Sequence, residues 1–168
     1  MRNKKIKILC VSGVLGALVF VLTAYLHIPT SNGYIHVGDA IIYLAACILP
    51  WQYAALVGAC GACLADCLTG YPMWAPASFV IKAVSVLLFT SKNKKIICGR
   101  NLFALPLAAL ACTLGYYLYE ALIYGSLVSP LVGIPASLAQ SLASSVLFVA
   151  IGLVSDKLNL KSKLNGGL

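Results

Sequence analysis

The 168-residue chain is too apolar for a soluble domain of its size. Hydrophobic residues make up 61% of it and charged residues only 10%, with a mean hydropathy of +0.96. These values predict an all-α integral membrane protein, and six spans of roughly 20 residues would use nearly the whole chain. Little of the chain is then left for a separate soluble catalytic module.

The net charge of +8 is concentrated in three clusters that flank apolar segments. This placement is what the excess of Lys and Arg on the cytoplasmic side of membrane proteins produces, so it requires no nucleic-acid partner. The clusters are Arg2, Lys4, Lys5 and Lys7, then Lys92, Lys94, Lys95 and Arg100, and finally Lys157, Lys161 and Lys163.

Hydropathy and turn-forming residues predict six helices in chain order, with polar loops between them. A basic start before an apolar run is also typical of a signal peptide, but residues 8–26 are long enough to span, and we retain them as the first helix. The helices are expected at about residues 6–26, 37–49, 52–68, 77–90, 102–124 and 131–154.

The basic clusters predict that both termini and the loop at 91–101 are cytoplasmic. Four spans separate the first two clusters and two separate the last two, so the parities agree. The loops at 29–36, 69–76 and 125–130 then face outward, and they contain neither Lys nor Arg. We expect residues 1–168 to form one transmembrane domain in the cell membrane.

Several kinds of catalytic or metal site are not expected in this chain. Six of the seven cysteines lie in apolar segments, where Cys behaves as a small hydrophobe, so the pair Cys60-x-x-Cys63 does not predict a zinc or redox site. No catalytic triad, HExxH or Walker motif is present. We therefore expect no enzyme activity, no metal and no cofactor in this chain.

Four charged residues lie inside apolar segments. Because a charge within a membrane is costly, each of them is expected to have a structural or functional role. Lys82 either pairs with an acid to hold helices together, or the acids face a water-filled cavity and bind a solute. Three acids against one base favour at least one contact with a ligand. The four are Asp39, Asp66, Lys82 and Glu120.

Aromatic and histidine residues mark the predicted outer face. Tyr71 and Trp74 share a loop with Gly70, Pro72 and Pro76, which is stiffer than a simple tether and is expected to cover a binding site. Tyr34 and His36 lie in the preceding outer loop. Each also has a neutral explanation, as part of an interfacial aromatic belt or as a polar residue at a helix start.

Several segments, in this order and at this spacing, resemble the substrate-binding S components of energy-coupling factor (ECF) vitamin transporters. Ser78 departs from the family pattern, which often has threonine there, but keeps the hydroxyl group. The segments are Gly33-Tyr34-Ile35-His36-Val37-Gly38-Asp39-Ala40, Leu44-Ala45-Ala46 with Pro50, Gly58, Gly61 and Leu64-Ala65-Asp66, and Trp74-Ala75-Pro76-Ala77 with Ile81-Lys82.

The resemblance implies a six-helix subunit that captures a micronutrient outside the cell. It implies that this subunit then topples in the membrane and so releases the solute inside. It also implies a transmembrane coupling subunit and two cytoplasmic ATPase subunits, which would use the ATP. By the same likeness, small residues of the first helix would dock the coupling subunit, in one of two registers: Gly13 with Ala17, or Ser12 with Gly16.

An acidic, aromatic pocket suits a flat heteroaromatic solute with hydrogen-bond donors, or a cationic amine. A pyridoxine- or pyrimidine-like vitamin fits, as does a deazaguanine such as queuine, whereas riboflavin and folate are less expected. The alternatives are a self-sufficient carrier or channel, and a membrane enzyme acting on lipid. The predicted substrate contacts are Tyr34, His36, Asp39, Asp66, Tyr71, Trp74, Lys82 and Glu120.

Overall fold

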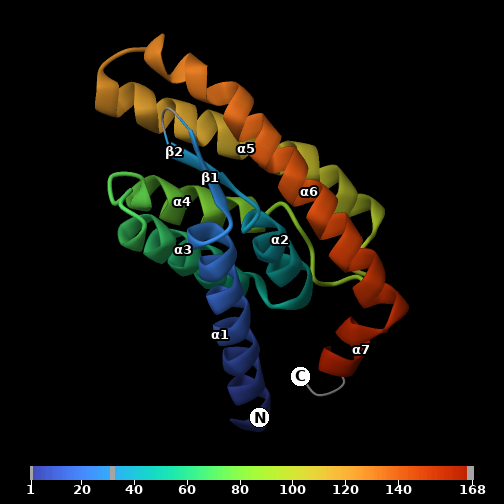
Figure 1. The fold of residues 1–168 in the computed structure, drawn as a ribbon. Coiled ribbons are helices and arrows are strands. Elements are labelled where there is room, and N and C mark those ends of the chain that lie inside the picture. The colour runs from blue at the N-terminus through green and yellow to red at the C-terminus, as the bar shows by residue number, and fades with distance from the viewer. Residues whose placement is uncertain (1, 31–32, 166–168) are drawn as a thin grey trace.

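The computed structural model describes residues 2–30 and 33–165 as a helical protein with one short hairpin (Figure 1). Each of the six expected helices has a counterpart in it. The elements are α1 (Arg2–Ala24), β1 (His27–Thr30), β2 (Gly33–His36), α2 (Asp39–Ile48), α3 (Trp51–Leu68), α4 (Ala75–Val86), α5 (Gly99–Tyr124), the 3-10 helix η1 (Ser129–Gly133), α6 (Ile134–Lys157) and α7 (Leu160–Asn165).

Helix lengths divide the six expected spans into two groups. Within the described ranges, four helical segments are long and apolar enough to cross a membrane: Lys4–Ala24, Trp51–Leu68, Gly99–Tyr124 and Ser129–Lys157. The helices α2 and α4 have 10 and 12 residues. At about 1.5 Å per residue they are some 15 and 18 Å long, against roughly 30 Å of hydrocarbon. The membrane-helical class is therefore observed, while the number of spans stays a prediction.

The short helix α2 forms the centre of the molecule. All ten of its residues are buried, and it packs against α1, α3, α4 and α6. Its sequence, DAIIYLAACI, is apolar on nearly every side, as a helix enclosed by others must be. Because its neighbours surround α2, its first residue, Asp39, lies inside the bundle.

The loop expected at 30–36 is partly a β-hairpin, which the sequence analysis did not predict. His27 to Thr30 pair antiparallel with His36 to Gly33, so Ile28 lies opposite Ile35. A connection of only two residues between two short segments favours antiparallel pairing over an open loop. Ser31 and Asn32 form that connection and lie outside the described residues. The hairpin packs against α1 and α6.

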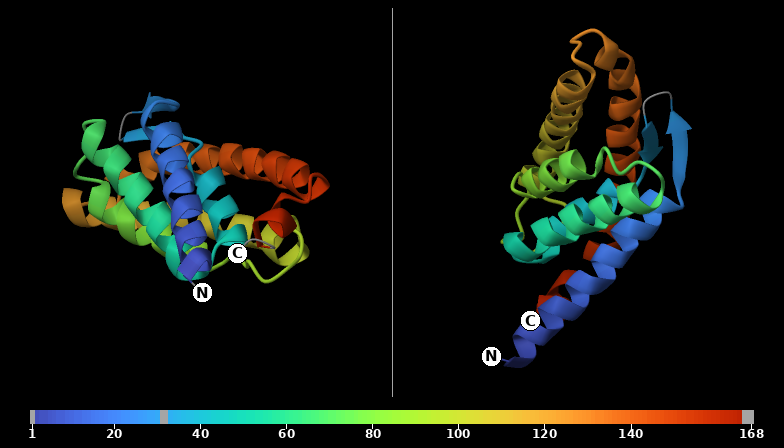
Figure 2. Two further views of the ribbon diagram at one scale, coloured as in Figure 1. Left: turned by 90° about the horizontal axis from the view of Figure 1, so that it is seen from below. Right: turned by 90° about the vertical axis from the view of Figure 1, so that its left-hand side faces the viewer.

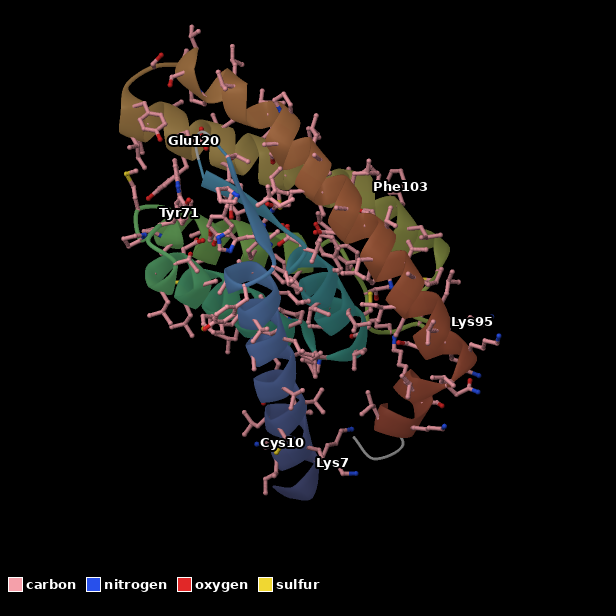
Figure 3. The ribbon with its side chains drawn as sticks, viewed as in Figure 1. Lys7, Cys10, Tyr71, Lys95, Phe103 and Glu120 are labelled. Atoms are coloured by element: carbon pink, nitrogen blue, oxygen red, sulfur yellow. The ribbon has the colours of Figure 1, made fainter. Side chains whose placement is uncertain are left out.

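Helices α5 and α6 lie side by side, as do α3 and α4, while α1 crosses α3 (Figures 1 and 2). The crossing is close, because a Cβ added to Gly61 of α3 would lie 2.8 Å from Val19 of α1. The start of α1 and the short helix α7 lie toward the same end of the molecule (Figure 2). In Figure 3, Lys7 and Lys95 lie toward that end, whereas Tyr71 and Glu120 lie toward the other.

Two polar side chains, the buried Asn101 and the half-buried Asp156, hold the basic segment between α4 and α5. The amide of Asn101 accepts a hydrogen bond from Thr90 N (2.9 Å) and donates to the Ile96 carbonyl (2.9 Å). The carboxylate of Asp156, on α6, accepts hydrogen bonds from Ile96 N (2.7 Å) and Ile97 N (2.9 Å). The segment is therefore tied to both α5 and α6.

Candidate functional site

A cavity lies between the hairpin and the adjoining ends of α3, α4, α5 and α6. Its empty volume is about 710 Å³, a figure that includes the open space at its mouth. Its wall is formed by Thr30, Tyr34, Ile35, His36, Asp66, Trp74, Ser78, Thr113, Tyr116, Tyr117, Glu120, Pro130, Gly133, Ile134, Ala136, Ser137 and Gln140.

The wall is acidic and aromatic. Its two carboxylates are Asp66, which is 4% exposed, and Glu120, which is 8% exposed. None of the described residues that line it is Lys or Arg. A carboxylate in such a place accepts strong hydrogen bonds, so the cavity favours a ligand with N–H or O–H donors.

The structure brings five of the eight predicted contact residues to this wall and leaves three outside it. Tyr34, His36, Asp66, Trp74 and Glu120 line the cavity, whereas Asp39, Lys82 and Tyr71 do not.

The hydroxyl of Tyr34 donates a hydrogen bond to Asp66 Oδ1, which joins the hairpin to α3. The buried Oδ2 of Asp66 has no hydrogen-bond partner within the described part of the chain. On its other side, the Tyr34 ring contacts Tyr71, with centroids 4.8 Å apart. Tyr71 therefore supports Tyr34, and Tyr34 in turn holds Asp66 at the cavity wall.

The predicted aromatic loop is attached to α5. The Tyr119 hydroxyl donates to the Met73 carbonyl (2.7 Å), and the Trp74 ring lies 6.0 Å from the Tyr119 ring. Trp74 is 8% exposed and precedes α4, whose first turn contains Pro76. The loop is thus held in place over one side of the cavity.

Of the four charged residues predicted as substrate contacts, two do not line the cavity. Lys82 Nζ lies 2.8 Å from Asp39 Oδ1 and 2.9 Å from Oδ2, and both side chains are 1% exposed. The pair is enclosed because α2 is the central helix. Lys82 therefore pairs with Asp39, behind the cavity wall, while Asp66 and Glu120 form part of that wall.

Two wall residues connect the cavity to this ion pair. Gln140 Nε2 donates to Asp39 Oδ2 (3.1 Å). The ring of Tyr116 lies with its centroid 5.3 Å from Lys82 Nζ, and its hydroxyl is hydrogen-bonded to Ser78 Oγ (2.7 Å). The ion pair thus fixes side chains that a ligand would touch.

Apart from Glu120, which was predicted as a substrate contact, sequence reasoning missed the polar wall residues that α5 and α6 contribute. Thr113, Tyr116, Tyr117 and Glu120 recur at helical spacing on α5, and Ser137 and Gln140 do so on α6. A polar stripe on an otherwise apolar helix was the available signal.

The small residues of α1 lie on two different faces. Gly13 and Ala17 are exposed, and a Cβ added to Gly13 would meet no atom within 4 Å. Ser12 and Gly16 are half-buried, and the Gly16 carbonyl would lie 3.1 Å from a Cβ on Gly61 of α3. Only the first pair presents both residues on the open face of α1.

Comparison with known proteins agrees with this architecture. The family described as "ECF-type riboflavin transporter, S component" matches residues 3–157. A solved structure described as that of the S component of a bacterial ECF transporter has the same fold, with a TM-score of 0.67 and 23% identity over 92% of this chain and 96% of that one.

A protein of Pyrococcus woesei described as "Uncharacterized protein in gap 3'region" is 33% identical over 99 residues. The match covers 58% of this chain and 66% of that protein, just under two thirds of its length. The family consists of membrane-integral transporter components, which agrees with the expectation that the chain is not an enzyme. Since the family match spans nearly the whole sequence, the chain belongs to the family of S components of ECF-type riboflavin transporters.

Proposed function

We propose that this chain captures a small heteroaromatic micronutrient from outside the cell in the cavity bounded by the hairpin, α3, α4, α5 and α6. The proposal rests on the composition of the cavity wall. Asp66 and Glu120 lie there among aromatic side chains, and none of the described lining residues is Lys or Arg. Aromatic rings bind the faces of a flat solute, and carboxylates accept hydrogen bonds from its edge.

The solute we propose is neutral or cationic and carries N–H or O–H donors. A pyridoxine-like or pyrimidine vitamin and a deazaguanine such as queuine meet this requirement. Riboflavin, which the family description names, also meets it with its ring N–H and hydroxyl groups, so we now include it. Phosphate esters and other anions are disfavoured, because two carboxylates would face them.

The proposed assembly contains a transmembrane coupling subunit and two cytoplasmic ATPase subunits, which supply the energy. Family membership supports this assembly and gives no support to a carrier, channel or lipid-modifying enzyme. On α1, the exposed pair Gly13 and Ala17 is the better docking register, because a partner helix can approach closely over small residues.

We also propose six spans with both termini cytoplasmic. The basic clusters support this topology, as does the separation of Lys7 and Lys95 from Glu120 in Figure 3. Helices α2 and α4 would then cross the membrane inside the bundle, packed against the longer helices.

Purified protein tests the capture function directly. Native mass spectrometry should detect a retained solute, and calorimetric titration with riboflavin, pyridoxine and queuine should give a dissociation constant below about 1 μM for one of them. A protein that retains no small molecule and binds none of the three would contradict the proposal.

A further inference from the structure

The main chain of His36 is held against α6 from both sides. Its N–H donates to Gln140 Oε1 (3.3 Å), and its carbonyl accepts a hydrogen bond from Ser144 Oγ (3.4 Å). Gln140 and Ser144 are four residues apart and therefore share one face of the helix. This end of β2 is fixed at the cavity wall.

The imidazole ring is fixed as well. The N–H of Gly38 donates to His36 Nδ1 (3.1 Å), so Nδ1 carries no proton. Gly38 has no room for a side chain, because an added Cβ would overlap Thr23 Oγ1 and lie 3.2 Å from Nδ1. In a neutral ring whose Nδ1 accepts a hydrogen bond, the proton is on Nε2. The ring therefore has one defined tautomer.

His36 is neutral at physiological pH. It lies in β2, outside the helices, and burial lowers the pKa of its imidazole to about 4. Nδ1 faces the main chain of Gly38, so Nε2, on the far edge of the ring, points away from that turn. Since His36 lines the cavity, its wall contains a donor as well as two carboxylates.

We propose that His36 is a specificity residue that donates a hydrogen bond from Nε2–H to an acceptor atom of the solute, either a carbonyl oxygen or a ring nitrogen. This inference rests on the proposed capture function and narrows its substrate class. The solute must carry an acceptor on its ring edge besides the donors that the carboxylates require, as lactams and pyrimidinones do. A simple aromatic amine would leave the buried donor unsatisfied, at a cost in affinity.

Two substitutions separate the donor from the structural role of the ring. In His36→Asn, the side-chain oxygen can accept the Gly38 N–H, as asparagine does in turns, but the amide is too short to replace Nε2. In His36→Gln, the longer amide can place an N–H near the position of Nε2, but the bond from Gly38 is lost.

The test titrates wild type and both variants with riboflavin, pyridoxine and queuine, and records their melting temperatures. For the probe that wild type binds, His36→Asn should weaken affinity about ten- to a hundredfold at nearly wild-type melting temperature. His36→Gln should bind more tightly than His36→Asn although it melts lower. The opposite order of affinities, or wild-type affinity in His36→Asn, would overturn the inference. Wild type that binds none of the probes would instead contradict the capture function.

Discussion

Replacing Asp39 by asparagine should destabilise the bundle severely, because it removes one charge of a pair whose side chains are both 1% exposed. The Lys82 ammonium would remain buried. It would still contact the Tyr116 ring and Cys112 Sγ (3.9 Å), but neither replaces the carboxylate charge. Breaking a buried pair in this way costs about 3–5 kcal/mol. For a chain of this size, that corresponds to a fall of roughly 6–20 °C in melting temperature.

The assay is thermal unfolding in detergent, with Asp39→Asn compared with the double variant Asp39→Asn/Lys82→Met. The double variant removes both charges and keeps an unbranched side chain, so it should regain most of the lost stability. Solute affinity should change much less in the double variant than after substitution of a wall carboxylate. If Asp39→Asn melts like wild type but loses affinity, the pair contacts the solute and our placement of it behind the wall is incorrect.

Three further predictions concern other parts of the molecule. In a Cys-free background, cysteine at Lys94 should react with an impermeant label only from the cytoplasmic side and cysteine at Trp74 only from outside; labelling of position 94 from outside intact cells would exclude the six-span topology. Gly13→Leu should preserve solute binding but abolish uptake, whereas Val14→Leu, an exposed control that changes little volume, should preserve both; equal uptake by the two variants would exclude the docking role. Asp156→Asn should speed hydrogen exchange of the two amides that its carboxylate binds, and unchanged exchange would mean that the basic segment is held by other contacts.

Helix positions were predictable because the helices are apolar and because proline and glycine mark where several of them begin and end. Pro76 and Pro135 lie in the first turns of α4 and α6, and Gly125 ends α5 in the left-handed conformation (φ 60°). The hairpin was not predicted, because its strands have only four residues each and one of them contains Pro29, a residue that is disfavoured within strands.

The cavity was only partly predictable, because charge marks a residue as needing a partner but does not identify it. Asp39 and Asp66 looked equivalent in the sequence, each being an acid in an apolar segment. Their difference arises from packing: Asp39 begins the enclosed helix α2 and meets Lys82, whereas Asp66 lies near the end of α3 and meets the hairpin. Gln140 carries no charge and was therefore overlooked, although it connects the two regions.

Calorimetric titration of Asp66→Asn and Glu120→Gln, beside their melting curves, tests whether the acidic cavity captures the solute. Each substitution keeps the shape of the side chain but removes a charge and half of the acceptor capacity, so it should cost about 2–4 kcal/mol of binding free energy. This corresponds to a loss of affinity of roughly thirty- to a thousandfold, with little change in melting temperature. Wild-type affinity in both variants would contradict the claim that this acidic cavity captures the solute.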